Sequence, residues 1–172
     1  MRKFAVIMQL PEGKLPGFYA QVIKALATKA QVFDREKEIL IIEHIQNLSP
    51  IQQILDQYNI SFDFLPLIHV PSSATLKPDY EDFGFITRSD HTFLYEDSII
   101  LFTFTHILGH SEDYAMALIQ LDEHLIASFP IGETLYYIAE KQYQDCFLGI
   151  AKAYQCTFKL VANMEEPLET TL

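Results

Sequence analysis

The chain has 172 residues, of which 49% are hydrophobic and 20% are charged, so it is long enough to bury a core as one ordinary globular domain without disulfide bonds. Acidic residues outnumber basic ones by 23 to 12, which gives a formal net charge of −11. The basic residues do not gather in one segment. We therefore expect no nucleic-acid partner, because the phosphate backbone would be repelled.

Residues 3–70 alternate between strand and helix patterns. The segment KFAVIMQL, residues 3–10, is a continuous apolar run ended by Pro11, which is typical of a strand buried on both faces. A helix start signal follows later, with Ser49 as the N-cap and Pro50 at the first helical position. In chain order, the patterns predict a strand at 3–10, a helix at 15–30, a strand at 38–45, a helix at 50–58 and a strand at 61–70.

Residues 71–91 interrupt this alternation. Prolines, serines and a Lys-Pro-Asp turn signal predict a long loop, and a loop of this length inside a domain is more often functional than idle. The β-prone segment 92–105 then predicts a hairpin that turns at Glu96 and Asp97.

The pattern of the C-terminal part begins with a helix start at Ser111, where Glu112 and Asp113 suit the positive end of the helix dipole. The expected buried stripe of this helix consists of Tyr114, Leu118, Leu121 and Leu125. A strand at 134–140, a helix at 141–155 and a strand at 156–162 follow.

About seven strands and four helices that mostly alternate predict an α/β fold with one mixed, partly parallel sheet and helices packed on it. We expect a single domain over residues 1–163 and a frayed acidic tail over 164–172. The alternative fold class is an α+β sandwich of ferredoxin-like units, because residues 3–45 and 134–162 each have a β-α-β pattern. No sequence repeat accompanies that symmetry.

The segment THILGHSEDYAMALIQLDEHL, residues 105–125, is the richest in chemistry. A continuous helix would place His110 and His124 about 20 Å apart, so His124 cannot join a site with His106 and His110. His106, His110 and Asp113 remain in a loop between a strand and a helix, where parallel α/β sheets bind ligands. These three are the candidate metal ligands, and the competing interpretation is loop histidines that meet solvent or backbone.

The two cysteines show no C-x-x-C spacing, so the sequence predicts neither a zinc ribbon nor a thioredoxin-like site. Cys146 falls on the apolar stripe of the helix at 141–155, which predicts a core thiol, whereas Cys156 opens the next strand and is expected nearer the surface. Asp90 and His91 are adjacent, and neighbours in sequence rarely point together. The nucleophile-elbow and nucleotide-loop motifs are absent from the sequence.

The N-terminal apolar run is too short for a secretory signal, and the longest uncharged stretch, 98–111, is too short for a membrane span. We therefore expect a cytoplasmic protein without a membrane partner. The leading hypothesis is a non-catalytic binding or regulatory module, with no cofactor, that acts on a protein partner or on itself. The alternative is a hydrolase or lyase, with or without a divalent metal, whose site lies in the loop at 106–113. No catalytic residue is identified.

Overall fold

The computed structural model describes residues 2–13, 16–106 and 111–161. They form two compact units, each described by itself. The N-terminal unit consists of residues 2–67 and 86–91, and the C-terminal unit consists of residues 68–85 and 92–161.

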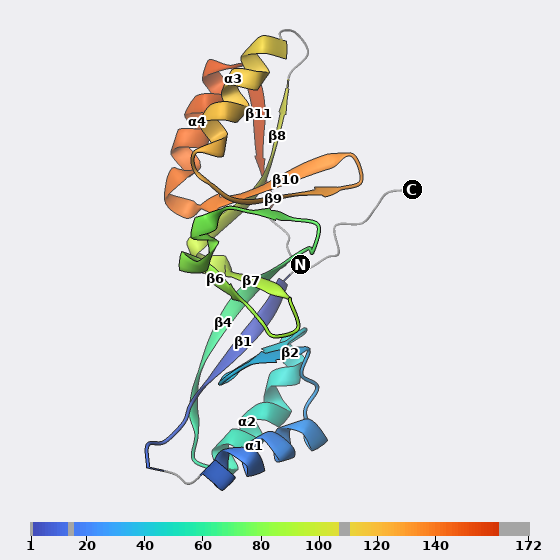
Figure 1. Cartoon of the computed structure of the whole chain (residues 1–172), viewed down its shortest axis with the longest axis vertical. Helices are drawn as coiled ribbons and strands as arrows, with labels where there is room; N and C mark the ends of the chain where they lie inside the picture. The colour runs from blue at the N-terminus through green and yellow to red at the C-terminus, as the bar shows by residue number, and fades with distance from the viewer. Residues whose placement is uncertain (1, 14–15, 107–110, 162–172) are drawn as a thin grey trace. The chain divides into compact units, whose positions relative to one another are not determined.

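The N-terminal unit contains four strands and two helices (Figure 1). They are β1 (Arg2–Gln9), α1 (Pro16–Lys29), β2 (Asp34–Glu36), β3 (Ile39–Ile42), α2 (Leu48–Gln57) and β4 (Ser61–Val70), whose last residues belong to the C-terminal unit. The strand order is β2-β3-β1-β4, and β3 pairs antiparallel with both β1 and β2. This is a β-α-β-β-α-β topology in which a third strand separates the two strands of each β-α-β unit, the order called ferredoxin-like.

The C-terminal unit repeats this order. Its elements are β5 (Thr75–Leu76), β6 (Gly84–Ile86), β7 (Thr92–Tyr95), β8 (Ile99–His106), α3 (Ser111–Asp122), β9 (Leu125–Ile131), β10 (Thr134–Glu140), α4 (Gln144–Ala153) and β11 (Cys156–Leu160). The sheet order is β11-β8-β10-β9-β5, and β8 pairs antiparallel with β10 and β11. Strands β8 to β11 with α3 and α4 therefore have the same connectivity as β1 to β4 with α1 and α2. Short 3-10 helices lie at Ile45–Asn47, Pro78–Asp82, Glu96–Ser98 and Lys141–Tyr143.

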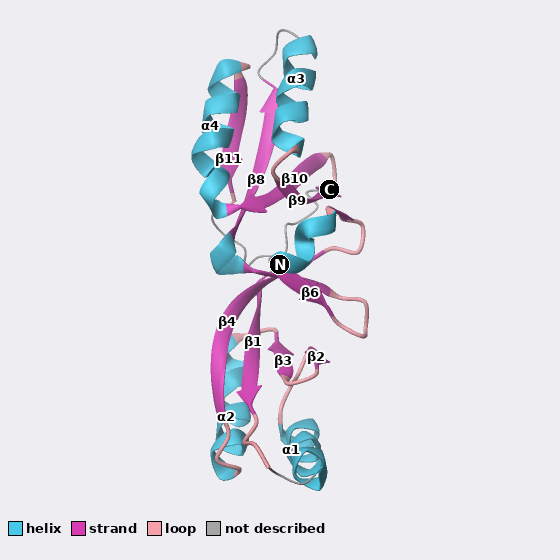
Figure 2. Ribbon diagram, turned by 60° about the vertical axis from the view of Figure 1, so that its left-hand side comes forward, coloured by secondary structure: helices cyan, strands magenta, loops and turns pink. Residues whose placement is uncertain are grey.

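In each unit the two helices cover one face of the sheet. Val22, Leu26, Ile51 and Leu55 of α1 and α2 pack on Val6 and Leu40 in the N-terminal unit. In the C-terminal unit, α3 and α4 run beside β8 and β11 (Figure 2). Ala117, Leu121, Phe147, Ile150 and Ala151 of these helices pack on Phe102 and Phe104.

The predicted fold class is wrong. The strands form two antiparallel sheets, of six strands in the order β2-β3-β1-β4-β7-β6 and of five strands, rather than one partly parallel sheet. Strand β8 shows why the sequence pattern led to the wrong sheet type. Ile100 and Phe102 face the helices, whereas Ile99 and Leu101 pack on Ile68 of β4 and on Leu94 of β7, so an antiparallel strand is buried on both faces. Its continuous apolar run is the pattern expected of a parallel strand.

Three further element predictions are corrected between residues 71 and 125. Strands β7 and β8 lie in different sheets, so residues 92–105 are not a hairpin. Leu125 is the first residue of β9 and does not extend the buried stripe of α3. Residues 71–91 are not one long loop, because β5, a 3-10 helix and β6 lie within them.

The two cysteines have the opposite burial to the one expected. Cys146 is exposed on α4, and Cys156 is buried at the start of β11 among the residues of the core. Helix α4 buries Phe147, Ile150 and Ala151, so its apolar stripe is rotated away from Cys146.

The prediction of a single domain over residues 1–163 stays a prediction, and the expected tail at 164–172 lies outside the described residues. Within the described ranges, no helix is long and apolar enough to cross a membrane.

Candidate functional site

A buried carboxylate collects four hydrogen bonds in the N-terminal unit. Asp34, on the edge strand β2, has a side chain that is only 8% exposed. Its Oδ2 accepts hydrogen bonds from Thr87 Oγ1 at 2.6 Å and from His91 Nδ1 at 2.7 Å. Its Oδ1 accepts from the Arg35 backbone N–H at 2.7 Å and from Ser89 Oγ at 3.1 Å. We call Asp34, Thr87, Ser89 and His91 the Asp34 cluster.

The three side-chain donors come from one tight turn, residues 87–91. The backbone N–H of Thr87 donates to the carbonyl of His91 at 2.9 Å, and Asp90 takes a left-handed conformation with φ of 61°. A second acid of the same strand holds this turn, because Glu36 Oε2 accepts the backbone N–H of Arg88 at 3.1 Å. Two carboxylates of β2 therefore fix both the side chains and the backbone of the turn.

The hydrogen bonds favour the ionised form of Asp34. Burial alone would raise its pKa, but the donors Thr87, His91, the Arg35 N–H and Ser89 more than offset that effect, so the pKa of Asp34 lies below its ordinary value. The carboxylate is therefore ionised at neutral pH, and it orients the imidazole of His91 through Nδ1.

Aromatic and cationic groups continue from His91 into the unit. The Phe33 ring lies 5.2 Å from the imidazole, and the buried Lys3 ammonium lies 4.4 Å from the centre of that ring. Lys3 Nζ also contacts Glu43 Oε1 at 2.6 Å and lowers the pKa of that carboxyl by this hydrogen bond and by its charge. The arrangement places an ionised acid at each end, with an imidazole, a ring and an ammonium between them.

The Asp34 cluster can do two things chemically. Its hydrogen bonds can hold the turn at residues 87–91 against the edge strand β2, which is a purely structural role. It can also hold the His91 imidazole, which is 38% exposed, in one tautomer and orientation, as the carboxylate does in hydrolases that use a histidine as general base. Sequence reasoning missed the acid: we expected Asp90 and His91 not to point together, and the partner of His91 is Asp34 on a distant strand.

No family model and no curated protein matches this chain. The ferredoxin-like strand order does not supply a function, because this topology carries many unrelated activities.

Two of the three predicted metal ligands, His106 and Asp113, are described by the structure. His106 ends β8, and its ring lies 5.5 Å from that of Tyr114 in the first turns of α3. Asp113 is an exposed residue of the first turn, and His110 lies outside the described residues. Among the residues that the structure describes, no group of three or more possible ligands is placed to hold a metal ion. The metal site at His106, His110 and Asp113, and the hydrolase or lyase site at 106–113, stay predictions.

Sequence reasoning did not place Cys156 beside these residues. Cys156 of β11 is the direct partner of His106 on β8 in the antiparallel ladder. Burial raises the pKa of the Cys156 thiol, and the charge of Asp113 raises it further. A raised pKa favours the neutral thiol, which is a poorer nucleophile than the thiolate.

His124 has its own partner at the opposite end of α3. It follows the helix and stacks on Tyr143 with ring centres 4.2 Å apart, whereas His106 packs on Tyr114 near the helix start. His106 and His124 therefore have different ring partners, whereas the predicted separation of His124 from His110 concerns a residue outside the described ranges and stays a prediction.

The helical surface of the C-terminal unit exposes large apolar side chains. Met116 and Ile119 of α3 are 50% and 59% exposed, and they lie three residues apart on one face of the helix. Leu148 of α4 is also exposed. We call Met116, Ile119 and the small exposed residue Ala115 the α3 surface.

Proposed function

We propose that this protein is a non-catalytic binding module that acts inside the cell and binds another protein through the α3 surface. The observation that carries the proposal is the exposure of Met116 and Ile119 on one helix face. Single exposed apolar residues are common on protein surfaces. Two large ones on one helix face form an apolar patch, and removing that patch from water by binding a partner would be favourable. The exposed free thiol of Cys146 is compatible with a reducing compartment.

The two exposed side chains supply part of the binding free energy, and the rest of the interface must offset the remaining cost of association, which is about 4–15 kcal/mol. Burying a whole Met or Ile side chain contributes about 1.5–3 kcal/mol, and each of these two is about half exposed. Their complete burial would therefore contribute about 1.5–3 kcal/mol together. The excess of acidic residues supports a protein partner over nucleic acid, and the proposal requires no cofactor.

The test is site-specific photo-crosslinking in cells that express the full chain. A photoreactive amino acid at position 119 is compared with one at position 45, because Ile45 is 55% exposed and lies in the N-terminal unit. We expect a discrete adduct with a second polypeptide from position 119 and not from position 45. We also expect Met116→Gln to reduce that adduct. Equal labelling from both positions, or no adduct from position 119, would refute the proposal.

A second candidate function is favoured by the Asp34 cluster. As the competing function, we propose that the protein is a hydrolase in which His91 is the general base. Asp34 orients the imidazole, with His91 Nδ1 and Asp34 Oδ2 2.7 Å apart. The test is hydrolysis of p-nitrophenyl acetate and p-nitrophenyl phosphate between pH 5 and 9 by the wild type, His91→Gln and Asp34→Asn. Rates that fall in both variants support this candidate, and wild-type rates that match those of His91→Gln exclude it for these esters.

A further inference from the structure

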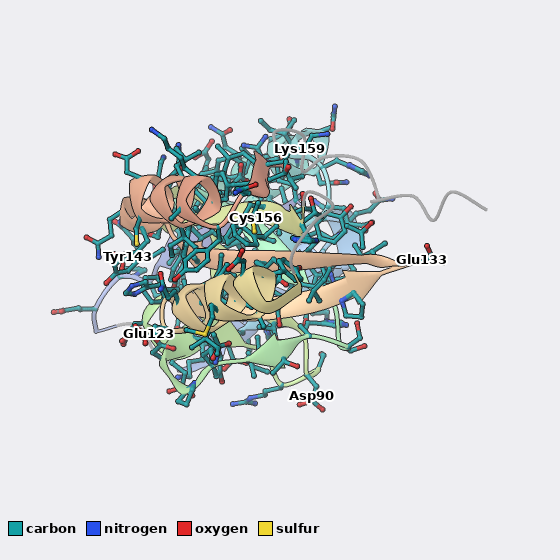
Figure 3. All side chains as sticks on the ribbon, turned by 90° about the horizontal axis from the view of Figure 1, so that it is seen from above. Asp90, Glu123, Glu133, Tyr143, Cys156 and Lys159 are labelled. Atoms are coloured by element: carbon teal, nitrogen blue, oxygen red, sulfur yellow. The ribbon has the colours of Figure 1, made fainter. Side chains whose placement is uncertain are left out.

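The α3 surface has acidic ends. Asp113 lies in the first turn of the helix, Asp122 is its last residue and Glu123 follows it, and all three are exposed. Glu123 lies at the molecular surface just past the end of α3 (Figure 3). The helix sequence SEDYAMALIQLD and the next residue contain no Lys, Arg or His. An apolar centre, formed by Met116 and Ile119, therefore lies between carboxylates.

The helix dipole does not account for the acids at the C-terminal end. The helix dipole favours acids at the N-terminus and bases at the C-terminus, by about 0.3–1 kcal/mol for each charge. Asp113 follows this rule, whereas Asp122 and Glu123 oppose it. Lys77 Nζ contacts Asp122 Oδ2 at 2.6 Å and offsets one of the two charges. Within the described part of the chain, no cation forms an ion pair with Glu123.

We propose that the α3 surface binds a basic amphipathic helix of another protein, an inference that rests on the proposed binding function. Apolar residues of the partner helix pack on Met116 and Ile119. Basic residues near its two ends meet Asp113 at one end and Glu123 at the other. The partner cations then supply at Glu123 the positive charge that the end of α3 lacks.

The partner segment is a helix because α3 offers side chains only. The main-chain groups in the middle of a helix are used by its own hydrogen bonds, so they cannot hold an added strand. Helices instead pack on helices by fitting ridges of side chains into grooves, with apolar positions three and four residues apart. The three-residue spacing of Met116 and Ile119 suits this packing.

A second copy of this chain is the less favourable occupant. A two-fold pair of α3 helices is antiparallel or parallel, and in either case an acidic end of one copy meets an acidic end of the other. Asp113 would face Asp122 and Glu123 in the antiparallel pair, and each acid would face its own counterpart in the parallel pair. Like charges in these positions oppose association, whereas a basic partner removes the conflict.

The positions of the acids set the size of the partner. Asp113 and Glu123 are ten residues apart, which corresponds to about 15 Å along a helix. A partner helix therefore needs basic residues about ten positions apart, with apolar residues on one face between them.

The probe for the test is an 18-residue helical peptide with a Leu stripe at helical spacing and Lys at both ends. Its binding to the full chain is measured by fluorescence anisotropy at several salt concentrations. We expect Met116→Gln with Ile119→Gln to weaken binding at least tenfold, because Gln keeps the helix but removes the apolar surface. Asp113→Asn with Glu123→Gln should weaken binding and flatten its salt dependence, because the ion pairs are lost.

Matched controls separate this interface from a general attraction to an acidic protein. Ile45→Gln removes an equally exposed isoleucine from the N-terminal unit and should leave binding unchanged. A peptide of the same composition, scrambled so that its apolar stripe is lost, should bind at least tenfold more weakly. Equal binding of the scrambled peptide, or unchanged binding by the Met116→Gln and Ile119→Gln double variant, overturns the proposal. Circular dichroism of each variant verifies that α3 is still formed.

The crosslinking result distinguishes failure of this inference from failure of the proposed function. If position 119 captures a partner but the basic peptide does not bind, the α3 surface binds a partner of other chemistry and the basic helix is wrong. An adduct between two copies of this chain has the same meaning. If neither experiment gives binding, the binding function itself falls.

Discussion

Replacing Asp34 by Ala is expected to destabilise the protein strongly, although Asp34 lies on the short edge strand β2. The change removes the acceptor of three side-chain donors, Thr87 Oγ1, His91 Nδ1 and Ser89 Oγ. A hydrogen bond to a charged group contributes about 1.5–3 kcal/mol. Ser89 is exposed and returns to water, so two of the three bonds dominate the loss.

We expect a loss of about 2–4 kcal/mol, because the buried hydroxyl of Thr87 recovers only part of its bonding through the His91 carbonyl, which lies 3.4 Å away. For a chain of this size each kcal/mol lowers Tm by about 2–4 °C, so Tm should fall by about 4–16 °C. Calorimetry and urea unfolding at pH 7 measure the change. Asp63→Ala is the matched control, because Asp63 is exposed and accepts one hydrogen bond from Gln9 at 2.9 Å. That control should cost about 0.5–1 kcal/mol.

The same pair of proteins gives a pH test. Since the pKa of Asp34 is lowered in the folded state, the unfolded chain binds the proton more readily, and stability rises with pH through this range. The contribution of Asp34 is complete above its ordinary value of 3.8 and is lost as the pH falls through the lower folded value. The gap between wild type and Asp34→Ala should therefore narrow in acid. A gap that is no larger than that of Asp63→Ala, or that does not change with pH, would refute this account of the cluster.

Two further predictions test the packing. Gly84→Ala places a Cβ in steric conflict with the carbonyl oxygen of Phe93 and should lower the free energy of unfolding by about 1–3 kcal/mol or more. Gly149→Ala on α4 meets no atom within 4 Å and should raise the free energy of unfolding by about 0.5–1 kcal/mol. Urea unfolding in which the two variants change stability in the same direction would contradict this account of the two glycines. Iodoacetamide should alkylate Cys146 in the native protein but should react with Cys156 only after unfolding, because Cys156 is buried and its pKa is raised. Peptide mass spectrometry measures the two labelling rates. Equal rates in the native protein would disprove the difference in burial between the two thiols.

The sequence identified most of the long elements, and their connectivity was harder to predict. Apolar periodicity placed the four helices and the strands β1, β3, β4, β10 and β11 close to their observed positions. Strand β2 has the sequence Asp-Arg-Glu and therefore carries no apolar signal. When β2 and β9 are missed, the remaining pattern is a simple alternation of strands and helices. This pattern arises when the two strands of a β-α-β unit are adjacent and parallel, and also when a third strand lies between them. Hydrophobic periodicity contains no information on which strands are neighbours, so the sheet type was wrong.

The Asp34 cluster could not be predicted from local sequence. Asp34 and His91 are 57 positions apart, and they come together only in the folded unit, where β2 at the sheet edge contacts the turn at residues 87–91. The α3 surface, by contrast, could be found. The predicted stripe includes Leu121, which is buried, and Tyr114 and Leu118, which pack on the core. Met116 and Ile119 fall outside that stripe, so the sequence already contained the signal that they are exposed.

The repeated strand order provides an internal reference within one polypeptide. Helix α1 has the same place in its unit as α3, and α2 has the same place as α4, although the sequences are unrelated. The described outward-facing residues of α1 and α2 are small, polar or charged and include no large apolar side chain, so this topology can be completed without one. Met116, Ile119 and Leu148 are thus exposed apolar side chains that the described helices of the N-terminal unit lack, so the shared topology alone does not require them.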